Sequence, residues 1–464
     1  MKMGNISGIT YESSGVSIRD QNWVNKKVVE SLGGLGMKVE GLFGGAISIP
    51  PYEEIYVGLS GASVRAGSPS TRSAGTLTAE RAFKKVNGTP VGVLDYFASP
   101  FMDKRVVDFV KGVAKKSLKN KTPVIGGESA QMQGTYKEGM YDGFVHVIEL
   151  RKEKDEYSCD ITKLVKKMEV PLLVASTDGV GTKTKIVRNP LDIIYHGFND
   201  IGALGVKPIA FGIYIAGNVS ENELVEIEKK SDTACKDLGI TKLEPIVEYK
   251  PRIYIEGEVD IAGTVLGVID RKNLITGENV KEGDVIIGIG VDAIMTNGYT
   301  LARKIGEELV KDWDASMKEF GGKSFREELS KSHVPMTDIL FGADDLEGIL
   351  SKYPGSVKAT AHITGGGQED NIKRMIPDGL CAKVERNVLP IPPVMKYFIE
   401  NGLSVDEAYR TFNMGVGFTL TVPEEKSDEI INYINKNFRN RLWCERPAAQ
   451  IGRIVKGNKK FVFK

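Results

Sequence analysis

Short apolar runs alternate with longer, more polar stretches along this chain. Residues 90–98, 170–174 and 208–216 are apolar runs of strand length, so they predict buried strands. The stretches that follow the first and third run, residues 103–119 and 221–238, predict helices. Strands followed by helices predict an α+β fold in which the helices lie on one side of the sheets.

The order of these elements repeats at a spacing of about 118 residues, the kind of fixed period that marks a duplication. Residues 90–98 align with residues 208–216, and a predicted helix follows each. Each copy then ends in a strand that leaves a glycine, at residues 143–148 and 263–269. The identity between the copies is weak, but the order of elements is the same, so we expect two front domains.

The pattern changes at about residue 273. Residues 282–290 predict a turn and then a buried strand. Further elements are expected in this last part: helices near residues 302–310, 368–375 and 426–437, and strands at 415–420 and 459–464. The chain therefore divides into three expected domains, at residues 1–150, 151–272 and 273–464.

Bulk composition narrows the functional class. The 464 residues are 41% hydrophobic and 27% charged, with a net charge of +1, so neither nucleic acid nor an anionic membrane is expected as a partner. We find no apolar run of bilayer-spanning length and no apolar core of a signal peptide. The four cysteines form no CxxC pair, which is typical of reduced thiols in a cytoplasmic protein. Four histidines make a histidine-rich zinc site unexpected.

The strand at residues 170–174 leads into the segment with the strongest chemical signal. Residues 176–183 read Ser-Thr-Asp-Gly-Val-Gly-Thr-Lys. The glycines let the backbone approach a phosphate, Lys183 supplies positive charge, and Asp178 can hold Mg²⁺. Asn199 and Asp200 offer further oxygen ligands downstream. We therefore expect a phosphate or metal site here.

Three later motifs suggest a second binding surface. Asn297-Gly298 is a turn signal, and residues 365–367 are three glycines that can present backbone N–H groups to an anion. His362 can act as an acid or a base, and Arg410 can bind a phosphate. Each has a plainer alternative: local turn geometry for Asn297, internal packing for His362, and a structural ion pair for Arg410.

Several motifs together resemble the aminoimidazole ribonucleotide synthetase family. They occur in the family's order: residues 15–18, 43–45, 126–132, 177–183, 297–299, 362–367 and 410–417. Two positions depart from the family pattern. The family usually has a histidine two residues before the asparagine that corresponds to Asn297, and this chain has Met295 there. Asp338 stands where the family has the arginine of a proline-threonine-arginine turn.

The resemblance implies a fold, a reaction and a set of site residues. The fold would be two front domains that share a barrel-like sheet, plus one α/β back domain. The reaction would be the ATP-dependent cyclisation of formylglycinamidine ribonucleotide to aminoimidazole ribonucleotide, with Mg²⁺. The implied roles are catalysis and metal binding by Asp178, Asp200 and Glu128, catalysis by Lys183 and His362, ATP binding by Gly126, Gly127, Gly179, Gly181, Thr182 and Asn199, and substrate binding by Asn297, Thr364, Gly365, Gly366 and Arg410.

The two front copies keep different parts of the family's motifs. The first keeps Gly-Gly-Glu at residues 126–128, but at residues 59–65 it has no acid. The second keeps Asp178 and the rest of its loop, but has no Gly-Gly-Glu at residues 246–251. We therefore expect an intramolecular pseudodimer, monomeric or homodimeric overall, with one composite site. The alternative is that the first copy is a structural duplicate only.

Other functions fit the sequence less well. A selenophosphate synthetase would need a cysteine or selenocysteine near the N-terminus, and a hydrogenase-maturation dehydratase would end in a cysteine. Thiamine phosphate kinase and the amidotransferase relative would not share both the motif at residues 362–367 and that at 410–417. A catalytically silent nucleotide-binding protein is the alternative from a different class. Met295, Asp338 and the motifs lost from the first copy favour it, whereas the intact loop from Asp178 to Lys183 and Asp200 oppose it.

Overall fold

The computed structural model describes residues 6, 9–14, 16–33, 45–49, 54–68, 70–442, 446–458 and 460–464. The chain divides into two compact units. The front unit comprises residues 16–197 and 206–272, and the back unit comprises residues 1–15, 198–205 and 273–464. The predicted boundary at residue 273 coincides with the start of the back unit's main segment, whereas the structure joins both predicted front domains in one compact unit.

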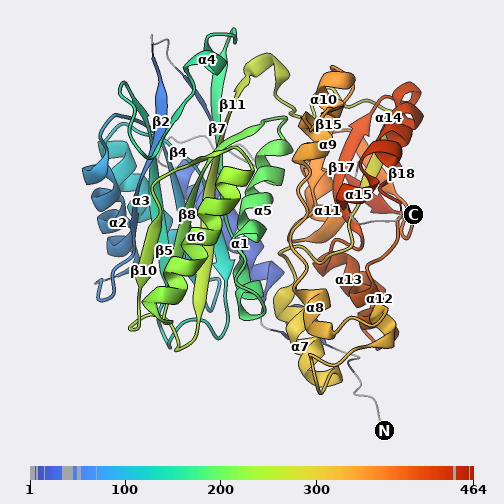
Figure 1. Cartoon of the computed structure of the whole chain (residues 1–464), viewed down its shortest axis with the longest axis horizontal. Coiled ribbons are helices and arrows are strands. Elements are labelled where there is room, and N and C mark those ends of the chain that lie inside the picture. The colour runs from blue at the N-terminus through green and yellow to red at the C-terminus, as the bar shows by residue number, and fades with distance from the viewer. Residues whose placement is uncertain are drawn as a thin grey trace. The chain divides into compact units, whose positions relative to one another are not determined.

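The first sheet of the front unit has the strand order β4-β3-β5-β2-β6. Helices α2 and α3 pack against one another on this sheet (Figure 1). Helix α1 packs on α3. Asp103 caps α3 by accepting a hydrogen bond from the backbone N–H of Arg105, as expected for a short acceptor side chain at a helix start. The elements are α1 (Ile18–Gly33), β2 (Tyr56–Ser63), α2 (Thr71–Lys85), β3 (Thr89–Ser99), α3 (Lys104–Lys119), β4 (Val124–Gln131), β5 (Asp142–Arg151) and β6 (Ser158–Asp160).

The second sheet of the front unit has the order β1-β7-β11-β8-β10, with β9 also paired to β8. Helix α6 packs against β8, β9 and β10. The elements are β1 (Gly45–Ser48), α4 (Thr162–Val165), β7 (Pro171–Gly179), a 3-10 helix (Gly181–Lys185), α5 (Leu191–Gly202), β8 (Pro208–Gly217), α6 (Glu221–Asp237), β9 (Thr241–Lys242), β10 (Ile246–Tyr249), β11 (Val259–Asp270) and a 3-10 turn (Arg271–Asn273).

The two sheets repeat one pattern and exchange strands. Their central orders, β2-β5-β3-β4 and β7-β11-β8-β10, correspond strand for strand. Strand β1 precedes the first set in the chain but pairs with β7, and β6 precedes the second set but pairs with β2. Apolar side chains from both sheets, including Leu59, Leu94, Leu173 and Leu266, share one buried cluster.

Residues 118 positions apart in the chain meet at the junction of the two sheets. Nδ1 of His146 lies 2.8 Å from the hydroxyl of Thr264. Tyr136 and Tyr254 form an antiparallel bridge, and their ring centroids are 5.0 Å apart. The rings of Tyr96 and Tyr214, which have the same separation in sequence, are 6.5 Å apart. The junction therefore joins pairs of residues that have the same separation in the sequence.

A buried ion pair occupies one side of this junction. Nζ of Lys250 lies 2.8 and 3.0 Å from Oδ1 and Oδ2 of Asp142. Oδ2 also accepts hydrogen bonds from the hydroxyls of Tyr214 and Tyr254. Asp142 is fully buried, and the Lys250 side chain is 8% exposed. The carboxylate therefore depends on Lys250 for charge compensation.

Replacement of Lys250 by methionine is expected to destabilise the protein. The change leaves the buried Asp142 carboxylate without its cation, which costs about 3–5 kcal/mol. Urea denaturation would measure the loss in the free energy of unfolding. Lys242→Met is the matched control, because Lys242 pairs with Glu228 and Asp232 at a site nearer the solvent; it should lose under about 1 kcal/mol. Equal losses in the two variants would contradict the prediction.

The back unit is built on a six-stranded sheet of order β15-β17-β12-β18-β16-β19. Its main elements are β12 (Val285–Gly290), α7 (Tyr299–Leu309), α8 (Phe325–Leu329), α9 (Thr337–Phe341), α10 (Ile349–Lys352), β15 (Ala359–His362), α11 (Gly367–Ile372), β16 (Leu380–Val384), α12 (Pro393–Glu400), α13 (Val405–Thr411), β17 (Val416–Val422), α14 (Glu424–Asn437), α15 (Arg439–Leu442), β18 (Ala448–Lys456) and β19 (Phe461–Phe463). A small hairpin, β13 (Gly342–Ala343) with β14 (Leu346–Glu347), and 3-10 turns at Lys318–Phe320 and Lys373–Met375 complete it.

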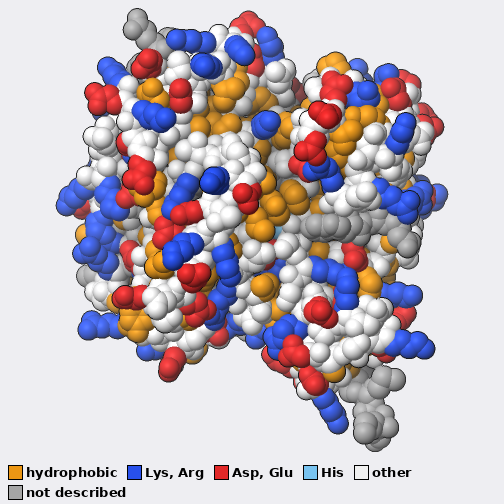
Figure 2. All heavy atoms as spheres, viewed as in Figure 1, with side chains coloured by type: hydrophobic (Ala, Val, Ile, Leu, Met, Phe, Trp, Pro, Cys, Tyr) orange, Lys and Arg blue, Asp and Glu red, His pale blue; other side chains and the backbone are white. Residues whose placement is uncertain are grey.

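Most predicted elements are confirmed with small shifts at their ends. The predicted helix at 302–310 begins earlier, at Tyr299, because Gly298 caps it in the left-handed conformation, with φ of 89°. The predicted helix at 368–375 is a six-residue α11 followed by a 3-10 turn. Of the family-like segments, Gly15, Phe43 and Gly44 lie outside the described residues. Basic and acidic side chains are interspersed on the face that Figure 2 shows.

Candidate functional site

Asp178 lies at the end of β7, where the strand leaves the sheet. Its Oδ1 accepts a hydrogen bond of 2.5 Å from the backbone N–H of Gly179, and its Oδ2 lies 2.9 Å from Nε2 of His196. The Asp178 side chain is 25% exposed, so the carboxylate remains accessible to a ligand. Gly181 follows with φ of +67°, a conformation that glycine adopts without strain. The structure thus forms a tight loop at the predicted position.

Lys183 points into the protein. Its Nζ lies 2.7 Å from Oδ1 of Asp192, and both side chains are fully buried. Burial lowers the pKa of the Lys183 ammonium, while Asp192 acts in the opposite direction. Sequence reasoning missed Asp192, because nothing in the loop motif indicates which acid will meet the lysine. Thr182 is also buried.

Glu128 lies on β4, which runs beside β7 in the front unit. Its Oε1 accepts a hydrogen bond of 2.8 Å from the backbone N–H of Ser129. Burial raises the pKa of Tyr96 well above its usual value, and the negative charges of Asp260, Asp178 and Glu128 add to this effect. Glu128 is the strand partner of Tyr96, and the Tyr96 hydroxyl lies against Gly179, the residue after Asp178. Tyr96 is therefore next to both segments. The backbone of Gly126 and Gly127 leads into this position.

The Glu128 and Asp178 carboxylates fit a divalent cation. Both are half-buried and offer oxygen ligands, which Mg²⁺ prefers. Asp200 fits less directly, since His362 occupies its Oδ1. Mg²⁺ bound at the two front-unit carboxylates would neutralise phosphate charge.

Asp95 is a candidate residue that sequence reasoning missed. It lies on β3 and is 5% exposed, and its Oδ2 has no hydrogen-bond partner among the described residues. Burial raises its pKa to about 7. The residue opposite it on β4 is Gly127, where a Cβ would lie 2.0 Å from Oδ1 of Asp95. A buried carboxyl without a partner is costly to a fold and typical of a functional site.

Asp95→Asn is expected to change how stability depends on pH. The pKa of Asp95 is about 7 in the folded protein against a reference of 3.8, so the folded state holds this proton more tightly. The contribution of this proton to the stability of the folded protein is complete below about pH 4 and is lost as the pH rises through 7. At pH 8 the asparagine variant should be more stable than wild type by up to about 4 kcal/mol. Urea denaturation at pH 5 and pH 8 would test this, and an equal difference at both pH values would contradict it.

In the back unit, Asn199 fixes the orientation of a histidine that sequence reasoning missed. Oδ1 of Asn199 accepts a hydrogen bond of 2.7 Å from the backbone N–H of Met336. Nδ2 of Asn199 donates a hydrogen bond of 2.9 Å to the carbonyl of Val334. The amide is thereby oriented. Nδ2 also lies 3.0 Å from Nε2 of His333, so this ring nitrogen acts as the acceptor.

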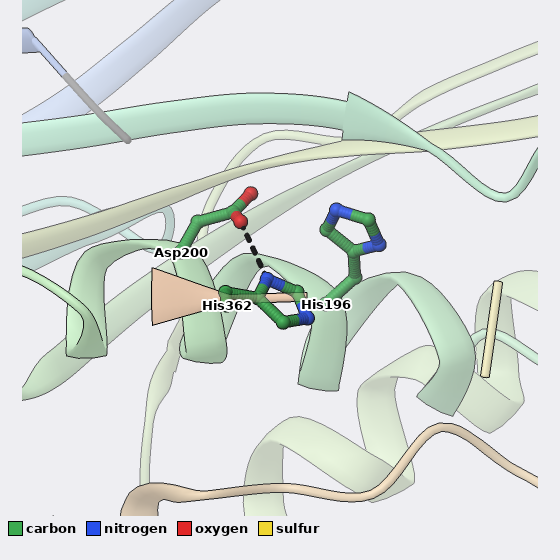
Figure 3. A group of neighbouring side chains, drawn as sticks. All are labelled: His196, Asp200 and His362. Carbon is green, nitrogen blue, oxygen red and sulfur yellow. Dashed lines mark hydrogen bonds and ion pairs between the residues drawn. The ribbon is translucent and has the colours of Figure 1, made fainter. Parts of the chain in front are cut away.

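His362 lies between His333 and Asp200. Its Nε2 is 3.2 Å from Nε2 of His333, and its Nδ1 is 2.8 Å from Oδ1 of Asp200. A carboxylate at Asp200 can only accept, so Nδ1 of His362 carries a hydrogen and donates it. Figure 3 shows the Asp200–His362 pair, with His196 one turn earlier on the same helix as Asp200. The geometry therefore fixes the orientation of the His362 ring through the Asp200 carboxylate.

The predicted substrate-side residues also meet in the back unit. Nδ2 of Asn297 lies near Gly365, 3.6 Å from where a Cβ would stand. Gly366 and Gly367 have φ of +85° and +63°, and a Cβ on Gly367 would lie 2.1 Å from the carbonyl oxygen of Tyr409. The glycines are therefore required by backbone geometry. Thr364 donates to Asn371, and Arg410 is exposed.

The structure shows what surrounds Met295 and Asp338, the two positions that depart from the family pattern. Met295 is buried, with φ of 72°. The adjacent Thr296 hydroxyl lies 3.4 Å from Nδ1 of His333, so an imidazole from another segment stands next to this turn. Asp338 pairs with Arg441.

Comparison with known proteins places this geometry in a family. A model described as AIR synthase related protein, C-terminal domain, matches residues 281–464, and its N-terminal counterpart matches residues 85–147. A phosphoribosylformylglycinamidine cyclo-ligase of Clostridium tetani is 33% identical over 344 residues, which are 72% of this chain and 93% of that protein. The chain belongs to the phosphoribosylformylglycinamidine cyclo-ligase family. The predicted family and enzyme class are therefore confirmed.

Another curated protein and one solved structure are also similar to parts of this chain. The cyclo-ligase of Alkaliphilus oremlandii is 33% identical over 64% of this chain and 86% of its own length. A thiamine-monophosphate kinase from Stenotrophomonas maltophilia aligns with 63% of this chain and 85% of its own, at 15% identity and a TM-score of 0.45. In the described part of the chain, every helix is too short or too polar to cross a membrane. Cys159, Cys235 and Cys381 are buried free thiols, and Cys444 lies outside the described residues.

Proposed function

We propose that this cyclo-ligase family member converts formylglycinamidine ribonucleotide and ATP into aminoimidazole ribonucleotide, ADP and phosphate, in the cytoplasm. The single observation that carries the proposal is the position of Tyr96, which pairs with Glu128 across two strands and contacts Gly179 beside Asp178, because neither half of the front unit holds both acids. ATP would transfer its terminal phosphoryl group to the formyl oxygen. The substrate's own nitrogen would then attack the formyl carbon, close the ring and expel phosphate.

In this proposal the protein mainly positions the reactants and neutralises charge. Asp178 and Glu128 would hold Mg²⁺ and the ATP phosphates, with the backbone of Gly179, Gly181 and Gly126 close to the nucleotide. Lys183 would offset phosphate charge from its buried position against Asp192.

The back-unit residues would serve the substrate. His362, held by Asp200 and His333, would donate a proton to a developing oxyanion. Asn297, Gly365 and Gly366 would bind the ribose phosphate and its surroundings. The metal role of Asp200 and the phosphate role of Arg410 are proposed on the family resemblance alone.

We also propose that residues 1–150 and 151–272 are tandem copies that form an intramolecular pseudodimer barrel. The exchanged strands β1 and β6 and the contacts between residues 118 apart support it. Chain length supports it too: since 344 aligned residues are 93% of the Clostridium tetani relative, that protein has about 370 residues, against 464 here.

The direct test is product formation from formylglycinamidine ribonucleotide by the purified chain with ATP and Mg²⁺. The proposal predicts aminoimidazole ribonucleotide and ADP in equal amounts, and at least a 100-fold loss in Asp178→Asn, the size expected when one charge-stabilising group is removed. ATP binding without any product would contradict it and favour the silent nucleotide-binding alternative.

A further inference from the structure

The two sides of the front unit's junction carry matching tyrosine–carboxylate clusters with one chemical difference. On one side, the hydroxyls of Tyr214 and Tyr254 donate to Asp142, at 2.6 and 2.7 Å. On the other, those of Tyr96 and Tyr136 donate to Asp260, at 3.3 and 2.8 Å. The corresponding residues are 118 apart in each case. The clusters are therefore structural twins.

The difference lies at the position that neutralises the carboxylate. Lys250 serves Asp142, but its twin is Met132, whose sulfur lies 3.8 Å from the Tyr96 hydroxyl and 3.7 Å from that of Tyr136. Asp260 is fully buried and has no ion pair with a cation in the described structure. Burial raises its pKa to about 7. A buried carboxyl without a neighbouring cation, which destabilises a fold, is therefore present on one side only.

The same side carries the nucleotide loop. A Cβ on Gly179 would lie 2.5 Å from the Tyr96 hydroxyl, so the missing side chain makes room for the phenol directly behind Asp178. Strand pairing identifies the twin of Gly179 as Ser63, since they pair with Ala262 and Phe144, which are 118 apart. Ser63 has a side chain, and its hydroxyl donates to Glu248 at 2.6 Å. The twin side therefore lacks the space that Gly179 leaves for a phenol ring.

We propose that Tyr96 and Asp260 are positioning residues for the nucleotide loop, whereas their twins Tyr214 and Asp142 only stabilise the fold. Asp260 holds the Tyr96 hydroxyl against Gly179, and Gly179 in turn holds the Asp178 carboxylate through its N–H. This inference rests on the proposed nucleotide role of Asp178. A displacement of the loop by about 1 Å is enough to lower a rate 100-fold.

The test compares Tyr96→Phe with the twin variant Tyr214→Phe. Each removes one buried hydroxyl from a matching cluster. Tyr96→Phe should weaken binding of a non-hydrolysable ATP analogue with Mg²⁺, or lower kcat, by about 10- to 100-fold. Tyr214→Phe should keep wild-type binding and kcat while lowering the unfolding midpoint. Equal binding and kcat in the two folded variants would overturn the inference.

A second variant keeps the test decisive if Tyr96→Phe folds poorly. Met132→Lys copies the twin's lysine beside Asp260, so it should raise stability while weakening nucleotide binding. Higher stability with unchanged nucleotide binding and kcat would overturn the proposal. Nucleotide binding is measured without the cyclisation, so a wild-type protein that binds the analogue but makes no product would refute the proposed reaction and leave this comparison intact.

Discussion

Glu128→Ala is expected to lower kcat for ATP-dependent product formation by about 100-fold or more, although Glu128 lies in the half of the front unit that lacks the nucleotide loop. The reason is that Glu128 is the strand partner of Tyr96, whose hydroxyl lies against Gly179 beside Asp178, and removal of one preorganised charge at a reacting phosphate costs this much. Steady-state kinetics on the folded variant would measure the loss.

Glu248→Ala is the matched control for this prediction. Glu248 lies on β10, the strand that corresponds to β4, and it contacts Ser63 and Lys250. It should retain wild-type kcat. Loss of activity in the control but not in Glu128→Ala would mean that the first half is scaffold and that the proposed site is wrong.

His362→Gln is expected to lower kcat by about 10²–10⁴-fold, the range for loss of a positioned acid or base. His362 is fully buried and is held by Asp200 and His333, and glutamine cannot deliver a proton from that position. The KM for ATP should change less than kcat, since the nucleotide loop lies in the other unit.

His146→Gln controls for the loss of a buried imidazole. His146 lies at the junction of the two sheets, and burial lowers its pKa to about 3, so it remains neutral at physiological pH. Its variant should keep kcat while losing some stability. Wild-type kcat in His362→Gln would contradict the proposed role of His362.

Much of the fold followed from local pattern. The apolar runs predicted β3, β7 and β8, because strands and helices are encoded by nearby residues. The 118-residue period predicted two tandem copies, and that duplication stays a prediction. The exchange of β1 and β6 was not predictable, since short strands carry too little pattern to specify a distant partner.

The site was predicted only where its residues belong to local sequence motifs. Asp178, Glu128 and His362 stand in recognisable motifs. Asp95, Asp192 and His333 do not. His333 gained its position through a contact with Asn199 across 134 residues, and Asp192 through the side chain of Lys183, which the loop motif does not pair with any acid. Lys183 is in a recognisable motif, but its contacts were not predictable from that motif. The motif indicates a cation that faces a phosphate, while the structure pairs Lys183 with a buried acid.

The central claim is that two unequal halves build one nucleotide site. Calorimetric titration with a non-hydrolysable ATP analogue and Mg²⁺ tests it most directly, on wild type, Glu128→Ala and Asp178→Asn. The account predicts one analogue bound per chain, and binding lost or weakened at least tenfold in both variants. Two analogues per chain, or wild-type binding by folded Glu128→Ala, would contradict it.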